Sequence, residues 1–226
     1  MKKAVVAFAI LIMVVFTSNA QVFVGGGLGV DYSKEKVSYG GTSYDAYNAF
    51  ALNLSPKVGY FLNDDFAIGL EVGLLTGTYK VPSSGSSGSD RKYGLTGWSV
   101  DAFARKNLIG IEKFALLLEG SVGVGGIKTK YTNGSTTTNY DPTFIFAVGV
   151  EPVLSYSVTE KLSIEAACNF LRFGFQSATT KDANNSNDKE TVTTLGLGVN
   201  SSTISVDYGG DISLSNPLTI GLVFRF

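Results

Sequence analysis

Eight charged residues sit within otherwise apolar segments at alternate positions, where they could form a buried chemical site. They are Lys57, Glu71, Asp101, Arg105, Glu119, Glu151, Glu165 and Arg225. On one inward face they could line a cation-selective pore or a proton path, or they could pair in a closed network. Because an unpaired buried charge is costly, the mixed signs favour a structural ion-pair network. Acids exceed bases in the set, so we hypothesise that one acid is protonated or hydrated.

Catalysis is not expected from this composition. The chain has no histidine, which removes the commonest general base and metal ligand. Serine and aspartate without a base form no activated nucleophile. Residues 182–190 alternate oxygen ligands as a calcium loop does, but Asn187 replaces the turn glycine and Thr193 replaces the bidentate glutamate. We therefore expect no enzyme activity, no catalytic residue, no cofactor and no metal site.

Charge and cysteine content exclude two further classes. The 226 residues include 18 Lys and Arg against 19 Asp and Glu, which is not the basic balance of a nucleic-acid binder. A single cysteine rules out an internal disulfide framework. The chain is 44% hydrophobic and only 16% charged, too apolar for disorder.

The amino terminus has the pattern of an export signal. Lys2 and Lys3 precede an apolar run over residues 4–16, and Ser18 and Ala20 are small residues at the −3 and −1 cleavage positions. The run is shorter than the ~20 residues that a membrane-spanning helix needs. We therefore predict a cleaved signal peptide over 1–20 and a single domain over 21–226.

The rest of the chain alternates large apolar and small or polar residues with the period of a β-strand. In residues 66–78 one face carries Phe66, Ile68, Leu70, Val72 and Leu74, and the other carries mostly small residues with Glu71. Eight segments share the pattern, two of them (22–32 and 162–170) more weakly: 22–32, 50–62, 66–78, 95–105, 114–124, 144–158, 162–170 and 218–226. The last of the weak matches slips near Leu171–Phe173, where we expect a bulge or the end of the lipid-facing part.

The bulky face predicts contact with lipid. A water-soluble barrel hides its large residues and exposes polar ones, whereas here the small and charged face suits a narrow lumen. Eight strands leave an interior just wide enough for side chains, and closure removes every unpaired edge. We predict an all-β, closed, antiparallel, up-and-down transmembrane β-barrel of eight strands. Aromatic girdles are expected at both rims, with Tyr79, Trp98 and Phe144 at one of them.

Short and long connections alternate along the chain. The turns near 63–65, 107–113 and 159–161 are short, while 33–49, 80–94, 128–142 and 176–217 read as long polar loops. This asymmetry is typical of outer-membrane barrels, and it predicts that both termini are periplasmic. Segments 191–199 and 203–208 within the last loop could be a ribbon above the membrane or two further spanning strands, giving ten. We favour eight because 203–208 is short of the ~9–11 residues that a spanning strand needs.

Two stretches resemble the small outer-membrane β-barrels of Gram-negative bacteria. Residues 56–70 (PKVGYFLNDDFAIGL) and 221–226 (GLVFRF) resemble the OmpX/OmpA-barrel type, and most closely the outer-membrane β-barrel domain family common in Bacteroidetes. The resemblance implies that Leu222, Phe224 and Phe226 form a recognition signal for the barrel-assembly machinery. The implied partners are that machinery and outer-membrane lipid, with a monomer as the expected state.

Three functions remain open from the sequence. The first is a non-enzymatic outer-membrane protein with a plugged lumen, whose exposed loops serve surface interaction or envelope integrity. The sequence does not identify the ligand of these loops. The second is a small porin for ions or small solutes. The third is a soluble periplasmic barrel that binds an apolar ligand.

Overall fold

The structure is a computed structural model that describes residues 21–39, 42–82, 90–181, 189–197, 204–207, 211–214 and 218–226. The predicted export signal, residues 1–20, lies outside the described residues. The same holds for most of the calcium-like loop, residues 182–188. In the part of the chain that is described, no helix is long and apolar enough to cross a membrane.

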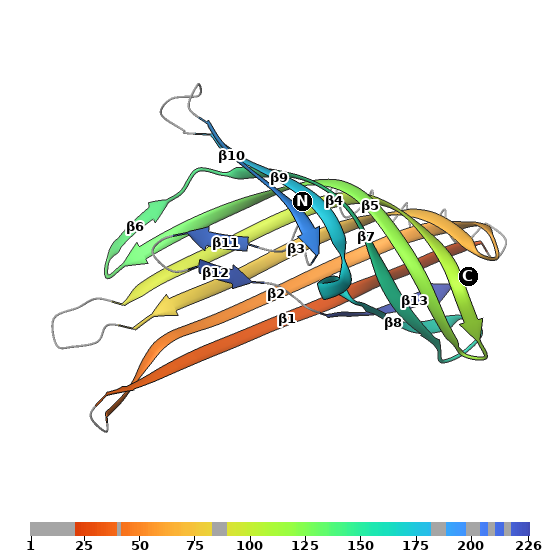
Figure 1. Cartoon of the computed structure of the whole chain (residues 1–226), viewed down its shortest axis with the longest axis horizontal. Helices are drawn as coiled ribbons and strands as arrows, with labels where there is room; N and C mark the ends of the chain where they lie inside the picture. Colours follow the sequence, from red (N-terminus) through yellow and green to blue (C-terminus); the bar gives the residue numbers. More distant parts are fainter. Residues whose placement is uncertain are drawn as a thin grey trace, which may run out of the picture.

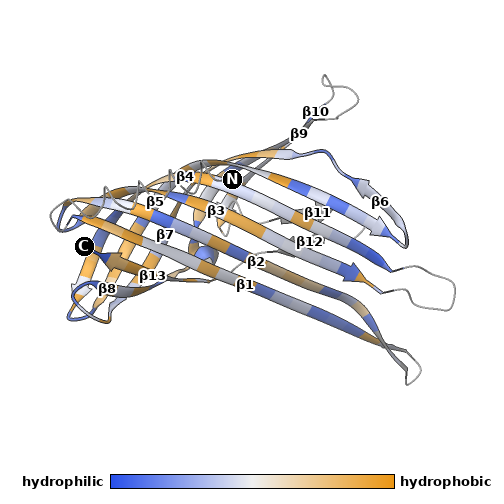
Figure 2. Ribbon diagram, turned by 180° about the vertical axis from the view of Figure 1, so that it is seen from behind, coloured by the Kyte–Doolittle hydropathy of each residue, from blue (hydrophilic) through white to orange (hydrophobic). Residues whose placement is uncertain are grey.

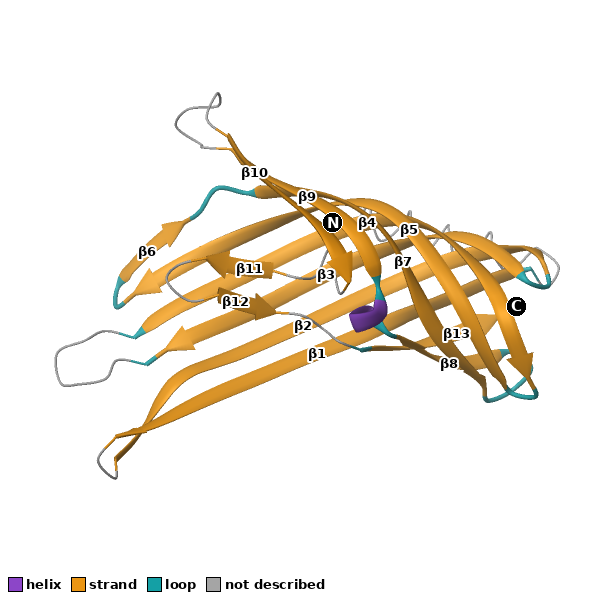
Figure 3. Ribbon diagram, in the orientation of Figure 1, coloured by secondary structure: helices purple, strands orange, loops and turns teal. Residues whose placement is uncertain are grey.

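Eight strand positions close into an antiparallel ring (Figures 1 and 3). In ring order the strands are β1 (Val22–Tyr39), β2 (Thr42–Asn63), β3 (Phe66–Val81), β4 (Arg91–Ile111), β5 (Phe114–Asn133), β7 (Thr143–Ser157), β8 (Leu162–Ala167) and β13 (Thr219–Arg225). Strand β13 pairs with β1 from Phe23 to Leu28 and so closes the ring. The predicted eight-stranded up-and-down β-barrel is confirmed.

The stagger of the ring fixes its width. Starting at Leu28 and following paired residues through β2, β3, β4 and β5, one reaches Phe144 on β7. In the other direction, through β13 and β8, one reaches Leu154. The ten-residue difference tilts the strands and leaves a narrow interior that side chains can fill.

Two of the eight strand positions in the barrel wall are each occupied by two separate strands instead of one continuous strand. A 3₁₀ turn, η1 (Asn169–Leu171), separates β8 from β9 (Phe173–Lys181), and both strands pair with β7. Ala167 pairs with Val153 and Phe173 pairs with Val150, so η1 adds three residues to this wall position. The expected bulge near Leu171 is therefore present.

The eighth position of the wall is divided in the same way. Strand β10 (Lys189–Leu197) pairs with β9, and β13 pairs with β8 farther along the same position. Along the chain, β10 and β13 are separated by β11 (Ile204–Asp207) and β12 (Asp211–Leu214), which form a separate two-stranded sheet. Of the two segments that would have made ten strands, 191–199 falls largely in β10, which shares the eighth position with β13, and 203–208 falls in β11, outside the ring, so the ten-strand alternative does not hold.

The four expected long loops are wrong in extent, because strands continue into each of them; the loop 176–217 contains the end of β9 and all of β10, β11 and β12. Strand β1 runs to Tyr39 and β2 begins at Thr42, so the expected loop 33–49 is almost entirely hairpin. The expected loops 80–94 and 128–142 likewise contain the ends of β3, β4 and β5 and the short β6 (Thr136–Asn139). These hairpins project together from the end of the barrel opposite the short turns and the C-terminus (Figure 1).

Cross-strand polar pairs explain why β-structure continues where the apolar alternation stops. In the first hairpin Lys34 Nζ lies 2.9 Å from Asp45 Oδ2. The hydrogen bond to this carboxylate raises the pKa of Lys34. At the third hairpin Thr132 Oγ1 and Thr137 Oγ1 are 3.3 Å apart. Such pairs stabilise a sheet without burial, so hydrophobic periodicity alone underestimates strand length.

The two faces of the barrel differ as predicted. Large apolar side chains cover the outside, with Leu70 54% and Leu222 57% exposed. Inward-facing Glu119 and Glu151 are only 6% and 7% exposed. Figure 2 shows that the hydrophobic residues gather toward the end that carries the C-terminus and the short turns, while the projecting hairpins are more hydrophilic. This arrangement is the inverse of a water-soluble barrel.

Candidate functional site

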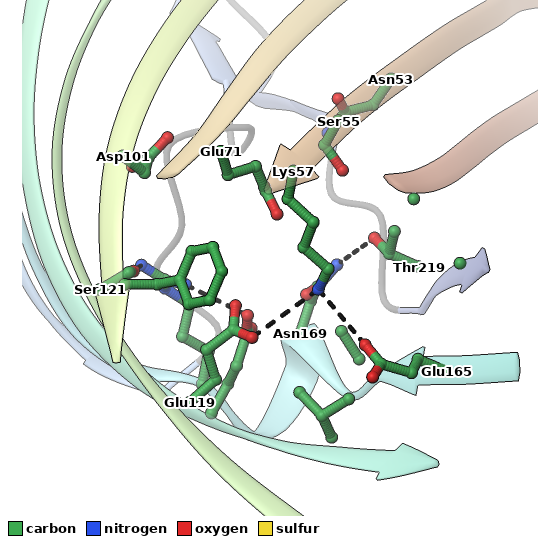
Figure 4. Close-up of a pocket in the computed structure, with 17 residues that line it drawn as sticks. Asn53, Ser55, Lys57, Glu71, Asp101, Glu119, Ser121, Glu165, Asn169 and Thr219 are labelled. Carbon is green, nitrogen blue, oxygen red and sulfur yellow. Dashed lines mark hydrogen bonds and ion pairs between the residues drawn. The ribbon is translucent and has the colours of Figure 1, made fainter. Parts of the chain in front are cut away.

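An ion-pair network crosses the lumen between strands on opposite walls (Figure 4). Arg105 on β4 donates from Nε to Glu119 on β5 over 3.0 Å, and Nη2 also contacts this carboxylate. Arg105 Nη1 donates to Glu165 Oε1 on β8 over 2.8 Å. Lys57 Nζ on β2 lies 3.7 Å from Glu119 Oε2 and 3.4 Å from Glu165 Oε2. Two cations and two carboxylates from four strands are thus joined in one buried network.

Strand register explains why these residues meet. Arg105 pairs with Glu119 across β4 and β5, and Lys57 pairs with Glu71 across β2 and β3. Each residue belongs to the inward-facing set of its strand, so the barrel wall aims each side chain at the lumen. Opposite charges at facing positions stabilise the sheet locally.

Glu71 and Asp101 face each other across β3 and β4 and reach the same cavity. Ser99 Oγ donates a hydrogen bond to Asp101 Oδ2 over 2.7 Å. Figure 4 shows Glu71 directed into the lumen beside Lys57. Neither acid belongs to the Arg105 network by direct ion pair among the described residues.

Arg172 is a lumen cation that sequence reasoning missed. The three residues of η1 shift the inward-facing set of the strand, so Arg172 is buried and points inward. Its Nη1 lies 3.4 Å from Glu151 Oε1, and its Nη2 donates to Ser121 Oγ over 2.8 Å. The slip in alternation near Leu171 was the available signal, but the size of the insertion was needed to assign Arg172 to the lumen.

Arg225 lies apart from the network. It is exposed at the end of β13, and its guanidinium carbon lies 4.4 Å from the centre of the Phe61 ring. The structure therefore brings Lys57, Arg105, Glu119 and Glu165 together and places Arg225 at the mouth beside the short turns.

A small cavity of about 80 Å³ lies among the lumen acids. Glu71, Asp101, Glu119, Glu151 and Glu165 all line it. Glu151 Oε2 is buried without a hydrogen-bond partner among the described residues. A polar space of this size holds a few water molecules, which would solvate the acids that the cations leave unpaired.

Apolar side chains fill the lumen below the charged network, at the end with the short turns. Phe23, Ala67, Phe103 and Val223 form a buried cluster there, which we call the lower cluster, with Phe61 packed against it. The guanidinium of Arg105 lies 5.1 Å from the centre of the Phe23 ring and 5.4 Å from that of Phe103, within the range of cation–π attraction. This end of the lumen is thus occupied by packed aromatic rings.

A second apolar cluster occupies the lumen toward the projecting hairpins. It consists of Ala49, Ala51 and Leu95, with Tyr47 and Tyr79 among the side chains packed against it. The assignment of Tyr79 to an outer aromatic girdle is therefore wrong, because its ring lies inside, 5.3 Å from that of Tyr47. The charged network is bounded by apolar layers on both sides, which the expectation of a lumen of small and charged residues did not include.

The three residues of the predicted assembly signal lie on the last strand. Leu222 and Phe224 are exposed on the outer face of β13, and the Phe224 and Phe226 rings are 5.1 Å apart. The backbone N–H of Phe226 donates to the carbonyl of Val22 over 3.1 Å, which holds the C-terminus beside the start of β1.

The described site offers ion pairing and solvation. In the described ranges no group of three or more His, Cys, Asp or Glu side chains is arranged to hold a metal ion. The charged side chains contact one another, hydroxyl groups and aromatic rings. The arrangement can stabilise a filled lumen.

Comparison with known proteins gives similarity of structure only. No protein-family model and no curated protein matches the sequence. The chain is similar to the attachment invasion locus protein Ail of Yersinia pestis (13% identity, TM-score 0.42, covering 92% of this chain and 100% of Ail). It is also similar to Neisserial surface protein A (15%, 0.37, 91% and 96%) and to the toluene transporter TodX of Pseudomonas putida (9%, 0.28, 94% and 69%).

Proposed function

We propose that this chain is a non-enzymatic integral outer-membrane protein of Gram-negative bacteria, with a lumen closed to diffusion. The observation that carries the proposal is the combination of an apolar outer face with a lumen filled by a charged network between two apolar layers. An outside of this kind is stable only in lipid, and a closed ring leaves few unpaired backbone groups there. The barrel then acts as an anchor.

The projecting hairpins are the part that can meet other molecules. They extend the strands well beyond the ~9–11 residues needed to span a membrane, since β2 alone has 22 residues. We assign the hairpin end to the cell exterior and both termini to the periplasm, because tight turns lie on the periplasmic side of such barrels. With the hairpins at the cell exterior and the barrel acting as a monomeric anchor, the role of the protein is surface interaction or envelope integrity.

The two ends of the chain fit this route to the membrane. An export signal over 1–20 would deliver the barrel to the periplasm. The exposed Leu222 and Phe224 and the terminal Phe226 would then be accessible to the barrel-assembly machinery. Outer-membrane lipid is the second partner, along the apolar face.

A closed lumen predicts that the barrel does not conduct ions across a membrane. The refolded chain in a planar lipid bilayer should give no steady openings in potassium chloride, because the apolar clusters exclude hydrated ions. The variant Phe23→Ala/Phe103→Ala/Tyr47→Ala/Tyr79→Ala removes rings from both apolar clusters and should raise the leak conductance, which shows that the assay detects an opened lumen.

Steady, cation-selective openings of the unmodified chain would overturn the closed lumen. They would favour the alternative of a small porin, in which the lumen acids around the cavity select cations.

A further inference from the structure

An open hollow of about 740 Å³ lies on the outer wall of the barrel, on the side of β4, β5 and β7. Its walls include Trp98 on β4 and Phe144 on β7, and its floor includes Gly126 on β5. These three residues are in register across the sheet, and the absence of a side chain at Gly126 leaves room that the Trp98 indole partly covers. Trp98 and Phe144 are 51% and 52% exposed. A Cβ at Gly126 would lie 2.9 Å from Trp98 Nε1, because the indole lies over the glycine.

Four exposed lysines lie between this hollow and the hairpin end of the barrel, and we call them the lysine cluster. They are Lys80 on β3, Lys92 on β4, and Lys128 and Lys130 on β5. Lys128 lines the hollow itself. Lys80 and Lys92 stand directly opposite each other across β3 and β4. Like charges at facing positions destabilise a sheet.

Within the described ranges, no carboxylate forms an ion pair with any of the four lysines. The cluster is therefore a positively charged patch that is complementary to an anion from outside the chain. Since the four span three adjacent strands, each about 4.8 Å from the next, the cluster is about 10 Å wide across the strands, and it extends about 13 Å along them because Lys92 lies opposite Thr132, four residues from Lys128. That width fits two phosphate groups better than one.

The sequence of β5 places the cluster at the edge of the lipid-facing surface. Its outward positions run from Val122 and Val124 through Gly126 to Lys128 and Lys130. Apolar side chains thus give way to lysines within four residues of the strand, from Val124 to Lys128. Such a change is expected where acyl chains end and headgroups begin. The hollow lies on the acyl side of this boundary with Lys128 at its rim, and the other three lysines lie on the headgroup side.

We propose that the hollow and the lysine cluster bind a doubly phosphorylated acyl glycolipid of the lipid A type. One acyl chain lies between Trp98 and Phe144, and the phosphates contact the lysines through charge-assisted hydrogen bonds. The choice of lipid A rests on the proposed function, because it assumes that the hairpin end lies in the outer leaflet.

The test uses the full refolded barrel in a neutral detergent, with diphosphoryl lipid A as the probe. Native mass spectrometry counts bound lipid, and fluorescence of Trp98, the single tryptophan, reports occupation of the hollow. The variant Lys92→Gln/Lys128→Gln/Lys130→Gln should weaken binding by about tenfold or more, given the contribution of each lysine near an anionic surface. Gly126→Leu should weaken it by filling the hollow.

The matched control is Lys106→Gln/Lys113→Gln/Lys161→Gln, which removes the same charge from exposed lysines at the short-turn end. Its binding should equal that of the unmodified chain. The proposal is overturned if the two triple variants weaken binding equally. It is also overturned if dephosphorylated lipid A or phosphatidylglycerol binds as tightly as diphosphoryl lipid A.

Failure here is distinct from failure of the proposed function. A barrel that binds lipid A at the lysine cluster but conducts ions would overturn only the closed lumen. A silent barrel that does not bind lipid A would overturn only the lipid site.

Discussion

Replacing Arg105 with methionine is expected to lower the free energy of unfolding by about 3–5 kcal/mol, the cost of removing one partner from a buried ion pair. Arg105 is 4% exposed and donates to both Glu119 and Glu165. Without it, the two carboxylates share only Lys57, whose Nζ is more than 3 Å from each. Urea unfolding of the refolded barrel in detergent, followed by gel mobility and Trp98 fluorescence, measures the change.

Two further variants show whether charge is the cause. In Arg105→Met/Glu119→Gln one acid leaves with the arginine, and Lys57 still faces Glu165, so most of the lost stability should return. Arg225→Met removes an exposed arginine that stacks on Phe61, and should cost about 1 kcal/mol or less. Equal effects for Arg105→Met and Arg225→Met would mean that the network does not stabilise the barrel.

Replacing Gly59 with alanine is the second large expected effect, a loss of about 1–3 kcal/mol from overpacking. A Cβ at Gly59 would clash with the Phe23 ring, which is fully buried in the lower apolar cluster and cannot swing away. Gly94 provides the matched control, because a Cβ there meets nothing within 4 Å. The same urea titration should find Gly94→Ala close to the unmodified chain.

A double variant tests the contact itself. Phe23→Leu shortens the side chain that meets Gly59, so Gly59→Ala should cost less in that background than in the unmodified chain. Additive effects would show that Gly59 and Phe23 do not constrain each other, and would contradict the packing of the lower cluster.

The fold was largely predictable because strand alternation is a local signal. The period-two alternation predicts which apolar residues of β3 and β7 point outward. Because the charged residues lie on the opposite face of each strand, it also predicts that the apolar face contacts lipid. The ends of the strands were not predictable in this way, since the hairpins are held by cross-strand polar pairs such as Lys34 with Asp45.

The contents of the lumen were predictable only in part. An inward charge such as Glu119 stands out in an apolar segment, but the partner that it meets depends on register across the ring. Alternation places Phe103 on the same face as Asp101 and Arg105, but a single strand does not show that a large ring fits there, because the space for the Phe23 and Phe103 rings comes from Gly59 and Gly69 on neighbouring strands. Arg172 required the three-residue insertion of η1.

The most direct test of the account is the environment of successive residues along β3 in liposomes. Nitroxide labels are placed one at a time at positions 70–74 in a Cys168→Ser background, and collision rates with oxygen and with a water-soluble nickel chelate are measured. We predict high oxygen collision at Leu70, Val72 and Leu74 and low collision with both reagents at Glu71 and Gly73. The account is contradicted if the labels at 70, 72 and 74 are shielded from oxygen while those at 71 and 73 collide freely with the chelate.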